Sequence, residues 1–379
     1  MQRPLGIMHT VSHDEWGGLE RRIFNESQWM SRRGHQITLA APPGSPLYEK
    51  AGAEGWRVLP MGFRRSRMPI DMLRLRRLLR KVRPDVLNTH GNADTKVGLS
   101  AALGLGIPCT ILSRHVTAPV RSSWYNRRLY RDLCRRVFTT SAAAARQIEK
   151  GLGMDAAHIL TVPSGIVPPD RLMPREAARQ ALAQELGRPE KTRFIGSVGR
   201  LSPEKGLEYL LAAFAGIAQK CPDHDLVLAG EGRHRAALVA CIRDMGLGPR
   251  VHLIGHREPL WPLLRALDLK VLASPENEGV PQSILEAMFA RCPVIGTAVG
   301  GIPDIIGHGT TGLLVRPRDP EELAAAILET ITDPGAARRR TAEAHQRAVT
   351  SHSIDVMGET ILGIYRQVFS EGGGPSQVF

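Results

Sequence analysis

Short apolar runs alternate with amphipathic helical patterns along the whole chain, which predicts alternating strands and helices. LGIMHT reads as a strand, the polar loop VSHDEWGG follows, and Leu19, Ile23, Phe24 and Met30 then keep helical spacing until Gly34 ends the helix. HQITLAAP completes a β-α-β unit. Further strands are predicted at DVLNTH, PCTILSRH, RVFTTS, HILTVPS, RFIGSVGR, HDLVLAG, RVHLIGH, DLKVLASP, CPVIGTA and TGLLV. This alternation predicts an α/β fold with mainly parallel sheets.

One segment interrupts the alternation. PSGIVPPDRLMPREAARQALAQELGRPEKT is rich in proline, carries a polar helix and contains no predicted strand. We therefore expect two doubly wound, Rossmann-like domains, residues 1–185 and residues 186–350. Ligands of such sheets bind at the carboxyl ends of the strands, and two domains in sequence would face each other across a cleft.

The composition, with 42% hydrophobic and 23% charged residues, is ordinary for a soluble globular protein. The longest uncharged run, residues 97–113, contains four glycines or prolines, so a buried helix and a strand explain it better than a membrane span. The N-terminus is too short and polar for a signal peptide. Five cysteines without a pairing pattern favour reduced thiols in a cytosolic protein.

The positive charge is concentrated in one part of the chain. Residues 61–150 carry 19 Lys or Arg and 5 Asp or Glu, whereas the rest of the chain is nearly neutral. This segment therefore accounts for the net charge of +13 of the whole chain. Such a region favours an anionic partner, and a solvated helix face is the alternative.

The segment SVGRLSPEKG follows a predicted strand and opens a helix. Arg200 and Lys205 place two positive charges beside a helix N-terminus, which suits a diphosphate. The spacing matches neither a P-loop nor the GxGxxG pattern of dinucleotide binding. The alternative is a strand-end arginine and a solvated lysine.

Two carboxylates bracket the segment ENEGVPQSILEA. Glu278 lies in a loop at the end of a strand, Pro281 suits the first helical position, and Glu286 lies one to two turns into the helix. A carboxylate can accept hydrogen bonds from two neighbouring hydroxyls, so each glutamate could hold a sugar or a ribose. Glu286 could instead be an acid that stabilises the helix dipole.

These segments resemble the signatures of the family 4 retaining glycosyltransferases. SVGRLSPEKG and SPENEGVPQSILEAMFARCPVIGTAVGGIPDII carry the likeness in the second half, including the E-x7-E pair Glu278 and Glu286. WGGLERRI, GHQITLAAPPGSPL and the histidine of SRH fit the family in the first half. The resemblance implies the GT-B fold. The sequence is similar to bacterial members of the family that extend lipopolysaccharide or other surface glycans.

The resemblance also implies roles for individual residues. Arg200 and Lys205 would bind the donor pyrophosphate, Glu286 the nucleotide ribose, and Glu278 the transferred sugar. The other donor-binding residues would be Gly17, Gly18, Gly279, Val280 and Pro281. His115 would lie beside the donor sugar, so that His115, Glu278, Arg200 and Lys205 form the expected catalytic set. His90 is more typical of a structural residue, and the sequence leaves the roles of His13, Asp14 and Asp304 open.

The domain roles follow from the same likeness. Residues 1–185 would bind the acceptor, residues 186–350 the nucleotide sugar, and residues 351–379 would form a helix that packs back on the first domain, followed by a short tail. The sequence departs from the family pattern at Arg291 and Cys292, where glycine is common at the turn, and at Asp304, where glutamate is frequent.

The implied reaction is sugar transfer from a UDP- or GDP-sugar to a hydroxyl of a glycan or lipid-linked acceptor. The acceptor would attack on the face that the diphosphate leaves, and a leaving phosphate oxygen would take its proton. No cluster of histidines and cysteines with the spacing of metal ligands is present, so we expect no metal and no cofactor. A sugar-nucleotide epimerase of the same fold and a non-catalytic sugar-nucleotide-binding subunit are the alternatives.

The basic region adds an expectation about location. FRRSRMPIDMLRLRRLLRKVR and RSSWYNRRLYRDLCRRV mix arginines with apolar and aromatic residues, which suits the surface of an anionic membrane. No nucleic-acid-binding motif is present, so nucleic acid is not expected as a partner. We expect a cytoplasmic protein associated with the inner face of the cytoplasmic membrane.

Overall fold

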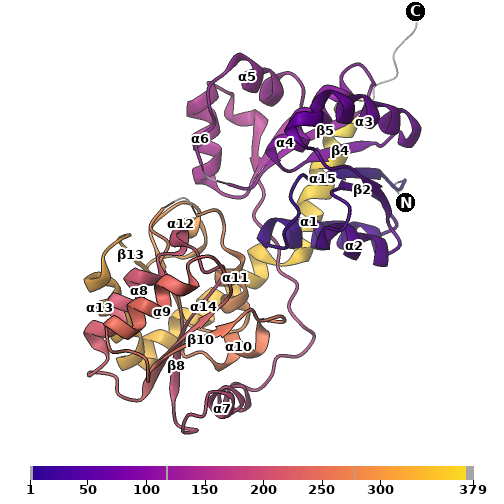
Figure 1. Ribbon diagram of the computed structural model, residues 1–379. Coiled ribbons are helices and arrows are strands. Elements are labelled where there is room, and N and C mark those ends of the chain that lie inside the picture. The colour runs from indigo at the N-terminus through magenta and orange to yellow at the C-terminus, as the bar shows by residue number, and fades with distance from the viewer. Residues whose placement is uncertain (1–2, 117, 277, 373–379) are drawn as a thin grey trace, which may run out of the picture. The chain divides into compact units, whose positions relative to one another are not determined.

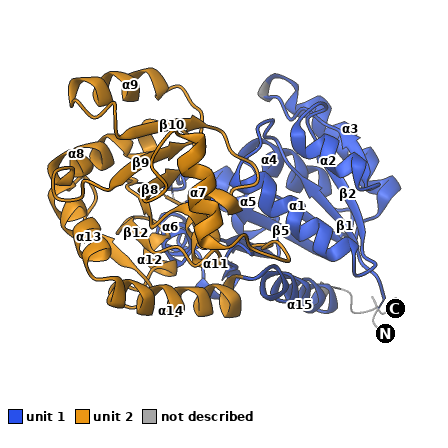
Figure 2. Ribbon diagram, turned by 90° about the horizontal axis from the view of Figure 1, so that it is seen from below, with its two compact units in different colours: residues 1–165, 353–379 blue, residues 166–352 orange. Residues whose placement is uncertain are grey.

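The computed structural model describes residues 3–116, 118–276 and 278–372 and divides the chain into two compact units (Figures 1 and 2). Unit 1 contains residues 1–165 and 353–379, and unit 2 contains residues 166–352. None of the helices within the described ranges is both long enough and apolar enough to cross a membrane.

Unit 1 is built on a sheet of seven parallel strands in the order β3-β2-β1-β4-β5-β6-β7. The strands are β1 (Gly6–Thr10), β2 (Gln36–Ala41), β3 (Arg57–Pro60), β4 (Val86–Thr89), β5 (Cys109–Arg114), β6 (Arg136–Thr139) and β7 (Ile159–Thr161). The helices are α1 (Gly18–Ser31), α2 (Pro46–Ala53), α3 (Met68–Val82), α4 (Asn92–Ala102), α5 (Trp124–Arg131), α6 (Ala142–Leu152) and α15 (Ile354–Gly372), with short 3₁₀ turns at Arg65–Arg67 and Ala156–His158.

Unit 2 repeats the plan with six parallel strands in the order β10-β9-β8-β11-β12-β13. The strands are β8 (Arg193–Val198), β9 (His224–Ala229), β10 (Val251–Gly255), β11 (Leu269–Leu272), β12 (Val294–Thr297) and β13 (Leu313–Val315). The helices are α7 (Arg175–Glu185), α8 (Leu207–Ile217), α9 (Arg235–Asp244), α10 (Trp261–Ala266), α11 (Gln282–Phe289), α12 (Ile302–Ile305), α13 (Pro320–Thr332) and α14 (Pro334–His352), with a 3₁₀ turn at Pro203–Lys205.

The sheet of unit 2 is covered on both faces, which explains why its strands read as nearly continuous apolar runs. Along β8, Phe194 belongs to one buried cluster and Ile195 to the other. Along β11, Val271 and Leu272 are divided in the same way, because successive side chains point to opposite faces. Two doubly wound parallel sheets confirm the predicted α/β architecture.

The last helix, α15, belongs to unit 1 and packs on α1. Gly358 allows this approach, because a Cβ atom there would lie 2.3 Å from the Trp29 ring. The fully buried Tyr365 donates its hydroxyl proton to Glu26 Oε1 (2.9 Å) and accepts a hydrogen bond from Asn88 Nδ2 on β4 (2.8 Å). The C-terminal segment therefore completes the core of unit 1.

Two details differ from the sequence-based expectations. Residues 166–185, expected in the first domain, lie in unit 2, since α7 packs on α10 and Ala178, Leu182 and Ala183 join the core of that unit. The edge strand β3 was not predicted, because RVLP is short, lies half-exposed and ends in proline.

Candidate active site

The loops that carry Arg200 and Glu278 leave the sheet of unit 2 at one place. Arg200 follows β8 and Glu278 follows β11, and these two strands are neighbours although α8, β9, α9, β10 and α10 separate them in sequence. The strand order reverses between β8 and β11, and ligands of open parallel sheets bind at such a switch point.

Glycines hold the two loops close together. Gly206 has a φ of +58°, and a Cβ atom on it would lie 2.2 Å from the carbonyl oxygen of Ala273, at the start of the loop after β11. A side chain at this position would both strain the backbone and push the loops apart. The glycine in SPEKG therefore fixes the position of Lys205, its neighbour, relative to the second loop.

Lys205 and Glu278 form an ion pair in this structure. Lys205 Nζ lies 2.6 Å from Glu278 Oε1 and 3.0 Å from Oε2, and Ser274 Oγ donates to Oε2 at 3.0 Å. Glu278 is 8% exposed and the Lys205 side chain 25%, so the pair is partly shielded from water. The residues expected to bind the phosphates and the sugar thus contact each other directly.

A double-glycine turn fixes the backbone of Glu278. Gly301 N–H donates to the Glu278 carbonyl at 3.0 Å, and Gly300 adopts a φ of +55° directly beside it. A Cβ atom on Gly300 would lie 1.8 Å from that carbonyl oxygen. The turn that belongs to the family signature therefore holds the first glutamate of the E-x7-E pair in place.

The second glutamate lies on α11. Glu286 is 7% exposed, on a helix that begins at Gln282 with Pro281 as its N-cap. Pro281 was predicted at the first helical position, one residue further into the helix, and helix boundaries commonly differ by this amount. Gly279 and Val280 lie in the loop before the helix, and Val280 packs against the core.

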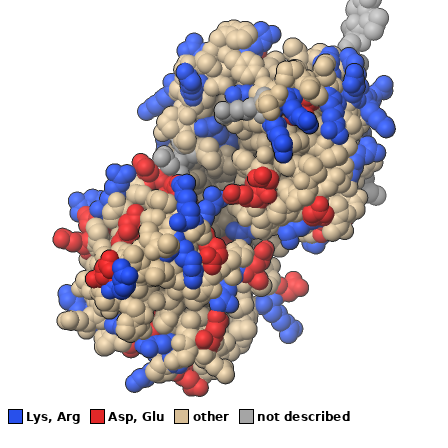
Figure 3. All heavy atoms as spheres, viewed as in Figure 1, with Lys and Arg blue, Asp and Glu red and all other residues tan. Residues whose placement is uncertain are grey.

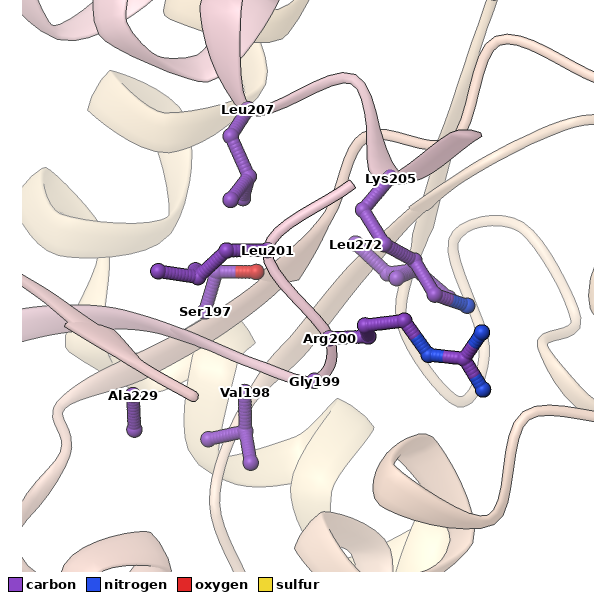
Figure 4. Close-up of a pocket in the computed structure, with 9 residues that line it drawn as sticks. All are labelled: Ser197, Val198, Gly199, Arg200, Leu201, Lys205, Leu207, Ala229 and Leu272. Carbon is purple, nitrogen blue, oxygen red and sulfur yellow. The ribbon is translucent and has the colours of Figure 1, made fainter. Parts of the chain in front are cut away.

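Arg200 and Lys205 stand at the rim of a small pocket in unit 2. The pocket is otherwise lined mainly by apolar side chains of β8, β9, β11, the loop after β8 and the start of α8, among them Val198, Leu201 and Leu207. Figure 4 shows the charged ends of Arg200 and Lys205 pointing the same way, away from these apolar side chains. Two cations with this common direction suit an anionic group such as a diphosphate.

The departure from the family pattern at Arg291 keeps the turn geometry. Arg291 adopts a φ of +55°, the left-handed conformation that glycine favours after a helix. Its N–H donates to the Met288 carbonyl (3.1 Å) and that of Cys292 to Ala287 (2.9 Å), which caps α11. An arginine therefore occupies a position that favours glycine, and the helix still ends there.

In unit 1, the glycine loop forms the start of α1. Gly17 is the N-cap of the helix, its N–H donates to Glu20 Oε2 at 2.9 Å, and the exposed Gly18 begins the first turn. Glu20 Oε1 lies 3.3 Å from His13 Nδ1, and this hydrogen bond raises the pKa of His13. Glu20 therefore ties His13 to the glycine loop.

His115 directly follows β5, and its Nε2 lies 3.1 Å from His90 Nδ1. The expected catalytic residues are therefore divided between the units: Arg200, Lys205 and Glu278 are together in unit 2, and His115 is in unit 1. Asp304 lies in α12, where its carbonyl accepts a hydrogen bond from Arg347.

Three polar residues near these groups were not predicted from the sequence. Lys270 lies in β11 with no exposed surface, Ser274 holds Glu278, and His9 lies in β1 beside His90. A signal for Lys270 was present, because a lysine in the middle of the apolar strand DLKVLAS breaks the pattern. His9 and Ser274 carry no such signal.

Comparisons with known proteins identify the family. The family described as glycosyl transferases group 1 matches residues 178–347, and the family described as Glycosyltransferase Family 4 matches residues 16–168. The chain belongs to the family 4 glycosyltransferases. Together the two matches span most of the chain and include both loops of the site in unit 2, so the predicted family is confirmed.

Individual relatives agree with this assignment. The chain is 28% identical to the glycogen synthase of Mycobacterium tuberculosis, over 92% of this chain and 91% of the relative. A glycosyltransferase structure from Rickettsia africae matches with a TM-score of 0.86 at 18% identity, over 97% of this chain and 99% of the other. Anabaena Alr3699/HepE in complex with UDP-glucose matches with a TM-score of 0.80 at 20% identity, over 96% and 100%. The structural matches support the GT-B fold of this family 4 glycosyltransferase.

Proposed function

We propose that this glycosyltransferase moves a sugar, with retention of configuration, from a nucleotide diphosphate sugar to a hydroxyl of a glycan or lipid-linked acceptor. The observation that carries the proposal is the Lys205–Glu278 ion pair beside Arg200 at the switch point of unit 2. In this proposal, the donor separates the pair: its diphosphate takes Lys205, and its sugar hydroxyls take Glu278. Glu286 binds the ribose, and Gly17 and Gly18 approach the phosphates.

The chemistry needs a stabilised leaving group. Breaking the sugar–phosphate bond puts negative charge on the diphosphate, and Arg200 and Lys205 oppose that charge with charge-assisted hydrogen bonds. Attack on the same face lets a leaving phosphate oxygen take the proton of the acceptor hydroxyl, so no protein base and no metal ion take part. HepE was solved with UDP-glucose, which supports a UDP-sugar as the donor, and a GDP-sugar is the other candidate.

A screen of nucleotide sugars tests the donor assignment. A ligand at a hundred times its Kd should add roughly 2.7 kcal/mol of stability, so the correct donor should raise the melting temperature clearly above buffer. The stabilising compound is then incubated with candidate glycan acceptors, with and without EDTA. Transfer that survives the chelator, with the anomeric configuration of the donor retained, is the expected result. Conversion of the donor without any acceptor would instead indicate an epimerase.

The acceptor is proposed to lie at a membrane surface, as part of lipopolysaccharide or other surface-glycan synthesis on the cytoplasmic side. On α3, Ile70 is 64% exposed and Leu73 60%, and Arg74 and Arg77 lie exposed on the following turn. On α5, Trp124 is 72% exposed beside arginines. Figure 3 shows basic side chains predominating over unit 1 on the face in view, whereas both signs mix over unit 2.

Vesicle sedimentation measures this surface directly. The protein should sediment with vesicles that contain anionic lipid, sediment less with neutral vesicles, and be released by salt, because each basic residue near an anionic leaflet adds about 1 kcal/mol. Arg74→Glu with Arg77→Glu should abolish the sedimentation. Arg338→Glu with Arg339→Glu, an equal charge change on exposed residues of unit 2, is the control and should leave it unchanged. No sedimentation with anionic vesicles would indicate a solvated helix face and a soluble acceptor.

A further inference from the structure

Three histidines lie side by side at the carboxyl ends of neighbouring strands in unit 1. His9 lies near the end of β1, His90 directly follows β4 and His115 directly follows β5. His9 Nδ1 is 2.9 Å from His90 Nε2, and His90 Nδ1 is 3.1 Å from His115 Nε2. The three imidazoles therefore form one continuous hydrogen-bonded chain at the switch point of this sheet.

The surroundings hold the middle ring in place. His90 is 5% exposed, its ring stacks on that of His115, and both of its ring nitrogens are used within the chain. Asp94 Oδ2 accepts hydrogen bonds from the backbone N–H of His90 (2.9 Å) and of Gly91 (3.1 Å), which fixes the polypeptide backbone at the end of β4. The orientation of the His90 ring is therefore set from two sides.

Burial keeps the three rings uncharged. It lowers the pKa of His9 to about 4 and holds the pKa values of His90 and His115 well below the ordinary range. The positive charge of Arg22 and the imidazole of His13, which also face His90 and His115, act in the same direction. Each ring thus carries one proton at neutral pH.

Three neutral rings joined by two hydrogen bonds have only two proton arrangements. In the first, His9 donates from Nδ1 to His90, His90 donates from Nδ1 to His115, and His115 carries its own proton on Nδ1. In the second, every proton lies on Nε2 and the direction of donation is reversed. The tautomer of His115 is therefore coupled to that of His9.

The two outer ring nitrogens of the three hydrogen-bonded histidines distinguish these arrangements. Neither His9 Nε2 nor His115 Nδ1 has a hydrogen-bond partner within the part of the chain that the structure describes, and both atoms are buried. The second arrangement would leave an N–H donor inside the core at His9, which has no exposed surface. The first places the unpaired donor on His115, whose Nδ1 is also covered but whose ring is partly exposed, so that a ligand that displaces the covering atoms can accept the hydrogen bond.

We infer that His9 and His90 are positioning residues that hold His115 as the Nδ1–H tautomer, a neutral donor for an oxygen atom of the bound ligand. This inference rests on the proposed function for the identity of the ligand, whose oxygen belongs to a sugar hydroxyl or a phosphate. His115 then donates a hydrogen bond and does not act as a base.

Nuclear magnetic resonance of the ligand-free protein tests the tautomer independently of the transferase proposal. Protein labelled with ¹⁵N in histidine is measured at pH 7.5 by long-range ¹H–¹⁵N correlation, with His115 assigned by the signals lost in His115→Gln. The expected result is a protonated Nδ1 and an unprotonated Nε2 on His115. A predominant Nε2–H tautomer or a charged ring would overturn the inference in the unmodified chain, whatever the variants do.

Variants of His9 test the coupling. His9→Phe removes the donor at the far end and should shift His115 toward the Nε2–H tautomer. His9→Asn, whose amide N–H can replace Nδ1, should restore the wild-type signals. His158→Phe changes a histidine of unit 1 that is not one of the three hydrogen-bonded histidines and that contacts the Tyr130 carbonyl. This variant should leave the tautomer of His115 unchanged. An unchanged His115 tautomer in folded His9→Phe would contradict the coupling.

A matched pair at position 115 tests the donor role in catalysis. Asn offers an N–H close to the place of Nδ1, whereas Asp offers only acceptor oxygens. With the donor that the nucleotide-sugar screen identifies, kcat/KM should be about tenfold lower in His115→Asp than in His115→Asn. Equal or reversed activities would overturn the donor role, while the tautomer measurement would still stand as a separate result.

Discussion

Replacing Lys205 by methionine should lower kcat/KM for sugar transfer about 10²- to 10³-fold and should also weaken the binding of the free nucleoside diphosphate. The expected loss is that of a preorganised donor to the leaving group, about 3–4 kcal/mol. Arg200→Ala should also lower kcat/KM and weaken diphosphate binding, because the charged ends of Arg200 and Lys205 point the same way. Isothermal titration with the diphosphate and initial rates with the donor measure the two effects.

Glu278→Gln should separate these two measurements. In the ligand-free protein Glu278 holds Lys205 at 2.6 Å, so a diphosphate must compete with the carboxylate for the ammonium group. The amide binds Lys205 less strongly, and the variant should bind the diphosphate as tightly as wild type or more tightly. Sugar transfer should still fall, since the hydroxyls of the donor sugar lose a charged acceptor.

Glu286→Gln should behave differently from Glu278→Gln. It should weaken both the donor and the free diphosphate, because the nucleoside diphosphate also contains the ribose. Lys220→Met removes an exposed lysine in the turn after α8 and serves as the control for lost charge, with no change expected in either measurement. If Glu278→Gln and Glu286→Gln show the same diphosphate affinity, the division between sugar and ribose is wrong.

Stability must be followed in the same variants. Lys205→Met removes the ammonium group from the carboxylate of Glu278, which is 8% exposed and still accepts a hydrogen bond from Ser274. Removing one partner of a buried pair can cost about 3–5 kcal/mol, and partial exposure of Lys205 should reduce this. Lys205→Met combined with Glu278→Gln should recover much of the loss in stability while remaining inactive, which distinguishes unfolding from a binding defect.

The strand pattern was predictable because both sheets are parallel and covered on two faces. Such strands read as short apolar runs, and the runs at β8 and β11 end at the loops of Arg200 and Glu278. The edge strand β3 was missed, since a half-exposed edge needs no apolar run. The boundary was placed at residue 185, because a polar helix reads as a linker when the surface that buries its few apolar residues is unknown.

The site was predictable where chemistry follows a local motif, and not where it depends on packing. The charges of Arg200, Lys205, Glu278 and Glu286 lie in two short segments, which the sequence shows directly. That Lys205 contacts Glu278 depends on β8 and β11 being neighbours, which is a property of the sheet. The three hydrogen-bonded histidines, His9, His90 and His115, come together only because three strand ends meet. In the sequence alone, His90 was therefore more typical of a structural residue.

Replacing Lys270 by methionine should stabilise unit 2 at neutral pH, and the gain should disappear as the pH rises. Lys270 has no exposed surface, and its Nζ donates to the carbonyl of Val271 at 3.2 Å. Burial lowers the pKa of Lys270 to about 7, and the nearby Lys205 lowers it further, whereas Glu278, Cys292 and Glu286 oppose the shift. Methionine has a similar length and no charge to bury.

The direction of the pH dependence follows from the protons bound in each state. In the unfolded chain Lys270 has its ordinary pKa of 10.5, so between pH 7 and 10.5 the unfolded state binds more protons than the folded state. Stability of the wild type therefore rises with pH in this window, relative to Lys270→Met. Below about pH 7 the wild type bears the full cost of burying the charged Lys270. Between pH 7 and 9.5 the difference in unfolding free energy between wild type and Lys270→Met should shrink by about 3 kcal/mol.

The measurement has to report on unit 2, because the chain has two units and a single transition is not assured. Hydrogen–deuterium exchange of peptides from β11 and α11, followed in urea at pH 6.5, 7.5, 8.5 and 9.5, gives the local free energy of unfolding for both proteins. Lys220→Met, the exposed control, should show no such dependence relative to wild type. A constant difference between wild type and Lys270→Met across this range would mean that Lys270 keeps its ordinary pKa in the folded protein, and that its ammonium group is stabilised by the carboxylates beside Lys205.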